Sequence, residues 1–403
     1  MAMTSQPQIA VGLDAGSSRT RCVIGAIENG GIRYLAHGLA PAAGWAKGRI
    51  IDPVALAESI RAAVNDAERG AHVSVESVTL GVGGMDVRGA QSRGLYEFGR
   101  PHELRSEDLE YAVALAADVR LERDRALLHV LPSDFTLDGR AGFRRPQQSV
   151  CSRLEANVHI VTTALQEHQA LLAAAHLAHL AVEETVFEPM AAAYACLRPE
   201  ARARGVALVD IGLQSSDLVI YNGESMLLAA SIPIWGDHLT HDIAAMFHVA
   251  YEDAEVLKQE YGCAVLGLTA DSSLIEVPSP EGHSSREARR SELNEILEAR
   301  AEEMFLHIRA ELQRVGMERH LYEGIVLTGG GALLTGMCDM AEHVLDCQAA
   351  NGLVGEGDIG GWPEELKSPV WTTAAGLALF SAKLKLHRPP ARGVNGLMGF
   401  VLR

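Results

Sequence analysis

Apolar and polar positions alternate along this chain with two different periods, which predicts an α/β fold. Short β-branched runs at residues 9–13 and 22–27 flank a turn of small residues, and a second pair of runs at residues 207–211 and 218–221 does the same. Each pair predicts a β-hairpin. A further strand is predicted at residues 75–82.

Helical spacing of apolar residues predicts the longer elements. Asp52 followed by Pro53 is typical of a helix start, and Gly70 marks its expected end. The longest helix is expected at residues 286–315, and the polar stretch 268–285 before it has no period and is expected to be a loop. Two more helices are expected, at residues 106–120 and 167–180.

One motif occurs twice. Residues 11–18 have the sequence VGLDAGSS, and residues 207–216, about half a chain later, have the sequence ALVDIGLQSS. In both, an aspartate ends an apolar strand and is followed by glycine and hydroxyl side chains. The simplest explanation is a duplicated α/β lobe.

Composition narrows the class of protein. The 403 residues are 22% charged and 48% apolar, an ordinary balance for a soluble globular protein, and the length predicts roughly two to three compact units. There are 35 Lys and Arg against 52 Asp and Glu, a formal charge of −17, and only 5% aromatic residues. Both values argue against nucleic acid as a partner, because phosphate contacts need clustered cations and single strands need stacking platforms.

We expect a cytoplasmic protein. The longest apolar window, residues 171–182, is interrupted by His176 and His179, so no membrane span is predicted, and the first eight residues are too polar for a signal peptide. The six cysteines include no C-x-x-C pair, which favours reduced thiols.

The repeated motif has residue types that bind phosphate. Its first copy contains Asp14, Gly16, Ser17 and Ser18, and its second contains Asp210, Gly212, Gln214, Ser215 and Ser216. Glycine leaves backbone N–H groups open to phosphate oxygens, hydroxyls add donors, and the aspartate suits a magnesium ion held mostly through water. Either copy alone also fits an ordinary β-turn, but the repeat favours two turns that hold one polyphosphate from both sides.

A third turn follows a strand predicted at residues 324–327. Gly329, Gly330 and Gly331 precede Ala332 there. Consecutive glycines between a strand and a helix let a flat ligand pack against the backbone. A plain glycine-rich connection is the alternative when the segment is considered by itself.

The two D-x-G hairpins followed by T-G-G-G-A resemble the actin-like ATPase superfamily, and longer stretches are similar to the FtsA family of bacterial cell-division proteins. These stretches are KGRIID (47–52), HVLP (129–132), RLEANVH (153–159), GDHLT (236–240) and KQEYG (258–262). The RLEANVH stretch is the most particular to FtsA. The resemblance implies a two-lobed actin-like (ribonuclease H-like) α/β fold with an ATP cleft and an FtsA-type subdomain inserted in the first lobe.

The resemblance also implies a division of the chain. The expected parts are a first lobe (residues 1–84 and 163–205), an inserted subdomain (85–162), a second-lobe core (206–240 and 320–386), a second-lobe outer subdomain (241–319), and a C-terminal tether and anchor (387–403).

Several site roles follow from the resemblance alone. Asp14 and Asp210 would hold hydrated Mg²⁺ beside the phosphates of ATP, and the glycine turn would lie against the adenosine. Glu255 and Lys258 match positions that contact ribose, with a surface ion pair as the alternative. Glu188 matches a carboxylate that orients the attacking water, with a helix-capping acid as the alternative.

The second phosphate turn departs from the FtsA pattern. FtsA-like chains often have DIGGGTTD there, whereas Leu213 and Gln214 replace two glycines in this chain. If those positions need a positive φ or a close approach of phosphate, both substitutions cost free energy. We therefore expect ATP to act as a conformational and polymerisation ligand, with slow hydrolysis at most.

The last residues have the pattern of a short membrane anchor. After a proline-rich tether at residues 387–393, an apolar face is formed by Val394, Leu397, Met398, Phe400 and Val401. This pattern is typical of an amphipathic segment at a lipid surface, which FtsA has. A tail docked on its own domain, or a disordered end, is the alternative.

The long helix has a basic side. In FtsA the corresponding region receives the acidic C-terminal tail of the tubulin-like protein FtsZ, which makes Arg290, Asn294 and Arg300 the candidate contacts. A solvated helix face paired with neighbouring glutamates is the alternative.

Together with the resemblance, these features predict an actin-like cell-division protein. It would bind ATP, polymerise, anchor FtsZ filaments to the inner face of the cytoplasmic membrane and recruit later divisome proteins. The alternative is a PilM-like adaptor of pilus or secretion assembly, which binds the cytoplasmic tail of a membrane protein. The apolar C-terminal segment favours the first. A sugar kinase or chaperone-type ATPase is a third interpretation, disfavoured because no candidate sugar-binding acid or substrate-binding domain follows the ATPase unit.

Overall fold

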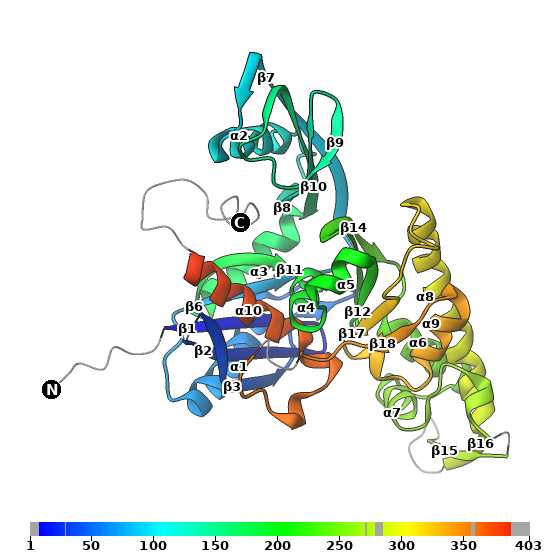
Figure 1. Cartoon of the computed structure of the whole chain (residues 1–403). Helices are drawn as coiled ribbons and strands as arrows, with labels where there is room; N and C mark the ends of the chain where they lie inside the picture. Colours follow the sequence, from blue (N-terminus) through cyan, green and yellow to red (C-terminus); the bar gives the residue numbers. More distant parts are fainter. Residues whose placement is uncertain (1–7, 29, 271, 279–284, 356–358, 388–403) are drawn as a thin grey trace.

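A computed structural model describes residues 8–28, 30–270, 272–278, 285–355 and 359–387. These residues form two lobes joined at the centre of the molecule and a subdomain that projects away from the junction (Figure 1). A five-stranded sheet organises the first lobe, and a nine-stranded sheet runs through the second lobe into the projecting subdomain.

The sheet of the first lobe has the strand order β11-β6-β1-β2-β3. Its strands are β1 (Ile9–Ala15), β2 (Arg19–Glu28), β3 (Gly31–Pro41), β6 (Ser77–Val82) and β11 (Ala181–Phe187). Strand β1 pairs antiparallel with β2 and parallel with β6. This confirms the first predicted hairpin and the strand predicted at residues 75–82, which is β6.

Helices cover both faces of this sheet. Helix α1 (Pro53–Ala71) and α3 (Leu165–Leu177) pack on one face, and α4 (Glu188–Cys196) and α10 (Thr372–His387) pack on the other. A Cβ on Gly12 of β1 would collide with the backbone of α10. This close contact of backbones fixes α10 directly over the strand that ends at Asp14.

Helix α1 starts as the sequence predicted. The Asp52 carboxylate accepts hydrogen bonds from the N–H groups of Val54 at 3.0 Å and Ala55 at 3.1 Å. Its apolar stripe at Leu56, Ile60 and Val64 is fully buried. Burial of such side chains contributes about 1.5–3 kcal/mol each.

The second lobe repeats the arrangement of the first. Its core strands lie in the order β18-β17-β12-β13-β14. This order matches β11-β6-β1-β2-β3 of the first lobe strand by strand, so that β12 takes the place of β1. Strand β12 pairs antiparallel with β13 and parallel with β17, as β1 does with β2 and β6. This confirms the predicted duplication. The strands are β12 (Val206–Ile211), β13 (Ser216–Asn222), β14 (Ser225–Ile232), β17 (Ile325–Thr328) and β18 (Ala349–Asn351).

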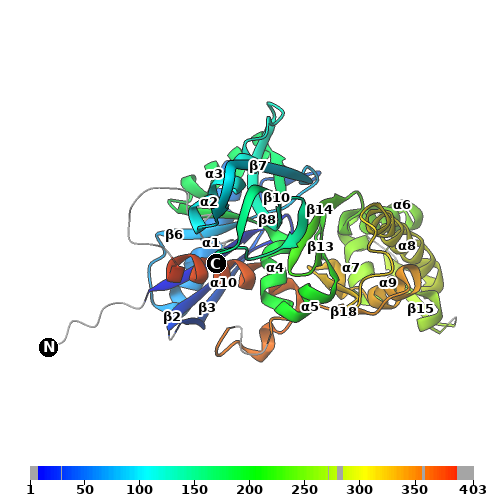
Figure 2. The ribbon, with the colours of Figure 1, turned by 45° about the horizontal axis from the view of Figure 1, so that its top comes forward.

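The projecting subdomain continues the second sheet. Strand β14 meets β7 through the single pair Ala230 and Arg88, beside the base of the subdomain (Figure 2). Its elements are β7 (Arg88–Glu103), α2 (Ser106–Ala117), β8 (Arg125–Leu137), β9 (Arg140–Phe143) and β10 (Val150–Ala164). Helix α2 packs on β7 and β10 around a separate apolar cluster. The division of the chain into five parts that the FtsA resemblance implies remains a proposal.

The outer part of the second lobe corrects one prediction. The helix expected from residue 286 begins only at Arg290, as α8 (Arg290–Arg314), and the expected loop before it contains β15 (Leu274–Pro278), which pairs with β16 (Ser285–Arg289). The reason is burial: Ile275, Val277 and Ala288 alternate with exposed residues and pack against α8 and its neighbours.

The remaining elements are short or lie around the cleft. They are β4 (Trp45–Ala46), β5 (Arg49–Ile50), α5 (Pro199–Arg204), α6 (Gly236–Phe247), α7 (Tyr251–Tyr261), α9 (Met337–Leu345), and the 3₁₀ turns η1 (Leu266–Leu268), η2 (Gly331–Leu333), η3 (Glu364–Leu366) and η4 (Pro369–Trp371). In the described part of the chain, no two cysteines form a disulfide. No helix within the described ranges is long and apolar enough to cross a membrane.

Candidate functional site

The two repeated turns and the glycine turn open onto one cavity of about 430 Å³ between the lobes. Asp14 comes from the first lobe and Asp210 from the second, and both line this cavity. The predicted residues that the structure brings together here are Asp14, Gly16, Ser17, Ser18, Glu188, Asp210, Gly212, Ser215, Glu255, Lys258, Gly329, Gly330 and Gly331.

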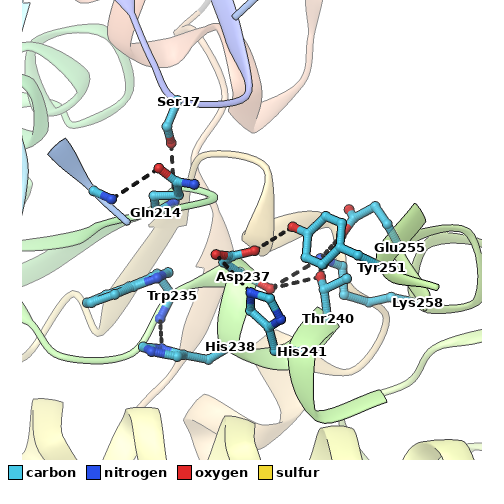
Figure 3. Close-up of polar contacts among 12 residues, drawn as sticks. Ser17, Gln214, Trp235, Asp237, His238, Thr240, His241, Tyr251, Glu255 and Lys258 are labelled. Carbon is cyan, nitrogen blue, oxygen red and sulfur yellow. Dashed lines mark hydrogen bonds and ion pairs between the residues drawn. The ribbon is translucent and has the colours of Figure 1, made fainter. Parts of the chain in front are cut away.

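Three predicted residues are not in the wall of the cavity. Ser216 begins β13 and is 1% exposed, and Ala332 is 2% exposed and packs in the apolar core of the second lobe. Gln214 lies at the edge, where its backbone N–H donates to Ser17 Oγ at 3.2 Å (Figure 3). Ser216 and Ala332 therefore shape the turns from behind, and we do not propose that their side chains contact a ligand.

The register of the two hairpins places two further charged residues in the cavity. Asp14 lies opposite Arg21 across β1 and β2, and Asp210 lies opposite Asp217 across β12 and β13. Both cross-strand partners line the cavity, although the sequence analysis did not select them. The sequence did contain a signal for these two residues, because Arg21 follows Asp14 by the same number of residues as Asp217 follows Asp210.

The carboxylates of Asp14, Glu188, Asp210 and Asp217 all line the cavity, and burial raises the pKa of each. The pKa of Asp14 rises to about 6, with Arg21 opposing the effect of burial and Asp210 adding to it. The pKa of Asp217 rises to about 7 despite hydrogen bonds from Ser231 and from the Gly84 N–H. Burial, and then the charges of the three aspartates, holds the pKa of Glu188 well above its usual value.

This donor set fits a hydrated cation. The only short ion pair of Asp14 in the described structure is with Arg21, at 3.8 Å, and Asp210 is held by a hydrogen bond from Thr373 at 2.7 Å. Among the described residues, no group of three or more side chains is arranged to ligate a metal directly. Mg²⁺ keeps several waters and combines one or two carboxylates with substrate phosphates, so Asp14 and Asp210 suit that mode of binding.

Glu188 is the first residue of α4 and lines the cavity. A Cβ on Gly83 would collide with its carboxylate and would lie 2.9 Å from Asp217 Oδ2. The glycine after β6 therefore leaves room for both acids. A buried acid with a raised pKa beside the phosphate turns is suited to hold or accept a proton from a water there.

The glycine turn also lines the cavity and packs against the end of β12. Gly329 adopts φ +79°, and a Cβ there would collide with Asp210 Oδ1 and lie 2.5 Å from the Ile211 carbonyl oxygen. Apolar side chains, including those of Leu239, Leu333 and Val370, also line the cavity. The cavity therefore offers both apolar side chains and polar turns to a ligand.

Glu255 and Lys258 form an ion pair and also line the cavity. Lys258 Nζ donates to Glu255 Oε2 at 2.6 Å and to Thr240 Oγ1 at 2.7 Å, which ties α7 to α6 (Figure 3). Burial opposes ionisation of Glu255, but Lys258 and the hydrogen bonds around it lower the pKa of the carboxylate. The lysine side chain is only 12% exposed, so this is not the solvated surface pair of the alternative.

The second phosphate turn carries no left-handed strain. Neither Leu213 nor Gln214 adopts a positive φ, so the first of the two expected costs of replacing glycine does not arise. The turn is also held from the other side, because the N–H of Gly236 donates to the Gly212 carbonyl and that of Asp237 donates to the Leu213 carbonyl.

The three residues of α8 predicted to contact a partner protein lie in different surroundings. Arg300 binds Asp242 through two hydrogen bonds of 2.6 and 3.0 Å, and Arg290 donates to the Tyr261 carbonyl at 2.6 Å. Asn294 is fully buried and bonds to Cys263 and Thr269. Its selection as a surface contact is corrected, because helical spacing could not show that the segment after α7, which contains Cys263 and Thr269, covers this side of α8. The predicted anchor residues Val394, Leu397, Met398, Phe400 and Val401 lie outside the described residues.

The raised pKa values predict a pH effect on stability. The folded pKa of Asp217, about 7, lies above the ordinary value of 3.8. The folded protein therefore binds more protons than the unfolded chain between these values, and its free energy of unfolding falls as the pH rises through this window. We expect Asp217→Asn to stabilise the nucleotide-free protein by on the order of 2 kcal/mol at pH 8, with most of that gain lost by pH 4.5.

Thermal or urea unfolding across pH 4.5–8 measures this effect. Asp339→Asn, an exposed substitution on α9, is the matched control and should leave the pH slope unchanged. An equal gain from Asp217→Asn at both ends of the pH range would contradict the assignment of the slope to this carboxyl.

Comparison with known proteins gives consistent matches. The family model described as "Cell division protein FtsA" matches residues 207–376, and the one described as "SHS2 domain inserted in FTSA" matches residues 84–162. The cell division protein FtsA of Pseudomonas aeruginosa is 31% identical over 381 residues, covering 94% of this chain and 91% of that protein. FtsA of Borreliella burgdorferi is 32% identical over 375 residues, covering 92% and 90%.

Solved structures resemble the fold as a whole. The PilM-PilN type IV pilus biogenesis complex includes a chain with a TM-score of 0.69 at 19% identity, covering 93% of this chain and 98% of that one. MreB5 of Spiroplasma citri bound to ADP has a TM-score of 0.56 at 14% identity, covering 94% and 97%. These likenesses confirm the predicted two-lobed actin-like fold.

Proposed function

The chain belongs to the FtsA family of cell-division proteins, and from this we infer that it binds ATP with hydrated Mg²⁺ in the interlobe cavity, polymerises, and anchors FtsZ filaments to the inner face of the cytoplasmic membrane. The observation that carries the ATP proposal is the convergence of two repeated D-x-G turns and a glycine turn on one cavity. The fold is shared with MreB5, whose structure is described as bound to ADP.

The roles of the site residues follow from their placement. Backbone N–H groups and hydroxyls of the two turns would bind the phosphates, Arg21 would supply a cationic side chain, and Asp14 and Asp210 would hold the hydrated ion. The bound Mg²⁺ would supply charge neutralisation of the phosphates. Glu188 would orient a water and hold its proton. Turnover would be slow, because Gln214 and Leu213 place side chains where the family often has glycine.

The partners follow from family membership. FtsZ, a second copy of this chain in a filament, membrane lipid and later divisome membrane proteins are the proposed partners, at the division site. On α8, Arg300 and Arg290 remain the candidate FtsZ contacts, and the apolar C-terminal segment is the candidate anchor. A PilM-like adaptor is the second candidate function. It has the support of a shared fold alone, whereas identity above 30% to FtsA proteins favours the first.

A co-sedimentation experiment tests this function. FtsZ filaments, vesicles containing anionic lipids and the full chain with Mg-ATP should pellet together. A chain ending at Arg388 should leave FtsZ in the supernatant while still binding a synthetic FtsZ tail peptide. Arg300→Ala should weaken peptide binding but leave vesicle binding unchanged. If the full chain pellets with vesicles and binds no FtsZ peptide, the FtsZ-anchoring role is wrong and an adaptor for another partner is favoured.

A further inference from the structure

The second phosphate turn is tied to a small hairpin that lies outside the cavity. Gln214 Oε1 accepts a hydrogen bond from the Gly48 N–H at 3.1 Å, across the junction of the two lobes. Gly48 belongs to the two-residue turn between β4 and β5, where Lys47 and Gly48 both have positive φ, as a type I′ hairpin requires. A Cβ on Gly48 would lie 2.9 Å from the Gln214 carbonyl oxygen, so hairpin and turn are in direct contact.

The two hydrogen bonds of Gln214 involve different parts of the residue, the backbone N–H in one and the side-chain oxygen in the other. Its backbone N–H bonds Ser17 Oγ at 3.2 Å, and both groups belong to turns proposed to bind phosphate. That bond must rearrange when phosphate takes these groups. The bond to Gly48 uses only the Gln214 side-chain oxygen, which is not in the cavity wall, so it remains available when the cavity is filled.

The far side of the hairpin is fastened to the base of the inserted subdomain. The Ile50 N–H donates to Glu167 Oε2 at 3.1 Å, and Arg49 lies 3.7 Å from Glu167 and 3.9 Å from Asp86. Glu167 follows the strand that leaves the subdomain, and Asp86 precedes the strand that enters it. The Arg49 pairs are half-exposed and individually weak, so the backbone bond of Ile50 is the firmer connection.

The base of the subdomain is itself a single bonded unit. Arg125 donates to the Asp86 carbonyl at 2.5 Å and to the Thr162 carbonyl at 2.9 Å, which joins the entering and leaving strands. Met85 packs against Gly48 from the same side. An unbroken set of contacts therefore runs from the second phosphate turn, through the β4–β5 hairpin, to both strands at the base of the subdomain.

We propose that Gln214 is a positioning residue that transmits the nucleotide state of the cavity to the inserted subdomain through the β4–β5 hairpin. The inference rests on the proposed ATP site and concerns its regulation. A glycine at position 214 could not accept the side-chain hydrogen bond from Gly48, so one of the two residues that depart from the family pattern is also the one that connects the two regions. Movement of the second turn on phosphate binding would pull or release the hairpin, and the base of the subdomain would follow.

Hydrogen exchange of the full chain tests the contact in the absence of nucleotide. Gln214→Met keeps the side-chain length but removes the amide oxygen, and we expect the Gly48 amide to exchange roughly fivefold faster, as loss of one hydrogen bond of about 1 kcal/mol implies. Gln214→Glu keeps an acceptor oxygen and should retain the wild-type rate. Unchanged exchange at Gly48 in Gln214→Met would overturn the contact.

Exchange with and without Mg-ATP then tests transmission. In the wild type, ATP should change exchange in residues 12–20 and 208–217, and also in residues 45–52 and 84–90. In Gln214→Met the response of residues 45–52 and 84–90 should shrink relative to the response of residues 12–20 and 208–217 in the same variant, because the hydrogen bond that links the two regions is lost. Gly48→Ala, which crowds Gln214 from the other side, should give the same result.

The two proposals fail in different ways. If ATP changes nothing in residues 12–20 and 208–217 of the wild type, the ATP site is wrong and transmission falls with it, while the nucleotide-free experiment still decides the Gln214–Gly48 contact. If ATP changes those residues and the response of 45–52 and 84–90 is the same in Gln214→Met as in the wild type, ATP binding stands and the role of Gln214 is overturned.

Discussion

Gly329→Ala will destabilise the folded protein by about 2–4 kcal/mol, because the new methyl group adds strain and a collision at the same point. Gly329 has φ +79°, which costs free energy for a residue with a Cβ. Its Cβ would collide with Asp210 Oδ1 and lie 2.5 Å from the Ile211 carbonyl oxygen, and both groups belong to the rigid end of β12. Asp210 would be displaced from its hydrogen bond with Thr373.

The neighbouring glycine is the matched control. Gly330 has φ −68°, and a Cβ there would meet nothing within 4 Å. Gly330→Ala should therefore leave stability within about 0.5 kcal/mol of the wild type. Urea unfolding of the two variants measures the difference. Equal stability of the two variants would show that the turn is not held against β12 as described.

Replacing both Asp14 and Asp210 by asparagine will remove the dependence of ATP affinity on Mg²⁺. If the two carboxylates hold the hydration shell of the ion, losing them should cost about 10–100-fold in affinity for Mg-ATP. Without Mg²⁺ the effect should reverse in sign, because two negative charges that face the polyphosphate are gone. Titration of the full chain with ATP, with Mg²⁺ or with EDTA, measures both arms.

The opposite signs in the two arms distinguish a metal role from misfolding. A variant that unfolds loses affinity in both arms, whereas the proposed site loses it only with Mg²⁺. Asp339→Asn, exposed on α9, is the control for a change of surface charge. A double variant that keeps the wild-type response to Mg²⁺ would show that the ion is held elsewhere.

The carboxylate cluster also shows how charge is arranged for a ligand. Four buried acids with raised pKa values face one arginine, an arrangement that costs stability in the nucleotide-free protein. A hydrated cation would offset that repulsion. The same acids thus account both for the predicted loss of stability between pH 4 and 7 and for the predicted Mg²⁺ dependence.

Local patterns in the sequence were enough for the hairpins, helix α1 and the repeat. The order of small residues after Asp14 and Asp210 required turns, and the N-cap Asp52 followed by Pro53 required a helix start. These features depend on neighbours within a few residues, so they are visible without a fold. The repeat then favoured two similar lobes with facing turns, whereas either copy alone also fits an ordinary β-turn.

Where burial decided the structure, the sequence was insufficient. Residues 286–289 were expected to begin the long helix, yet they belong to β16 because β15 lies beside them and Ala288 packs inward. Asn294 occupies a helical position that looks exposed, yet the α7–β15 region covers it. Arg21 and Asp217 entered the site through cross-strand register, which single residues do not reveal.

The sequence by itself determined the repeated α/β unit and the three turns, because each depends on the spacing of a few adjacent residues. Only the tertiary structure decided which carboxylates share one cavity, that Leu213 and Gln214 are unstrained, and that Gln214 reaches the Gly48 turn. These depend on contacts between residues about 30 to 200 positions apart, whose free energies are set by burial and by the packing of one lobe on the other.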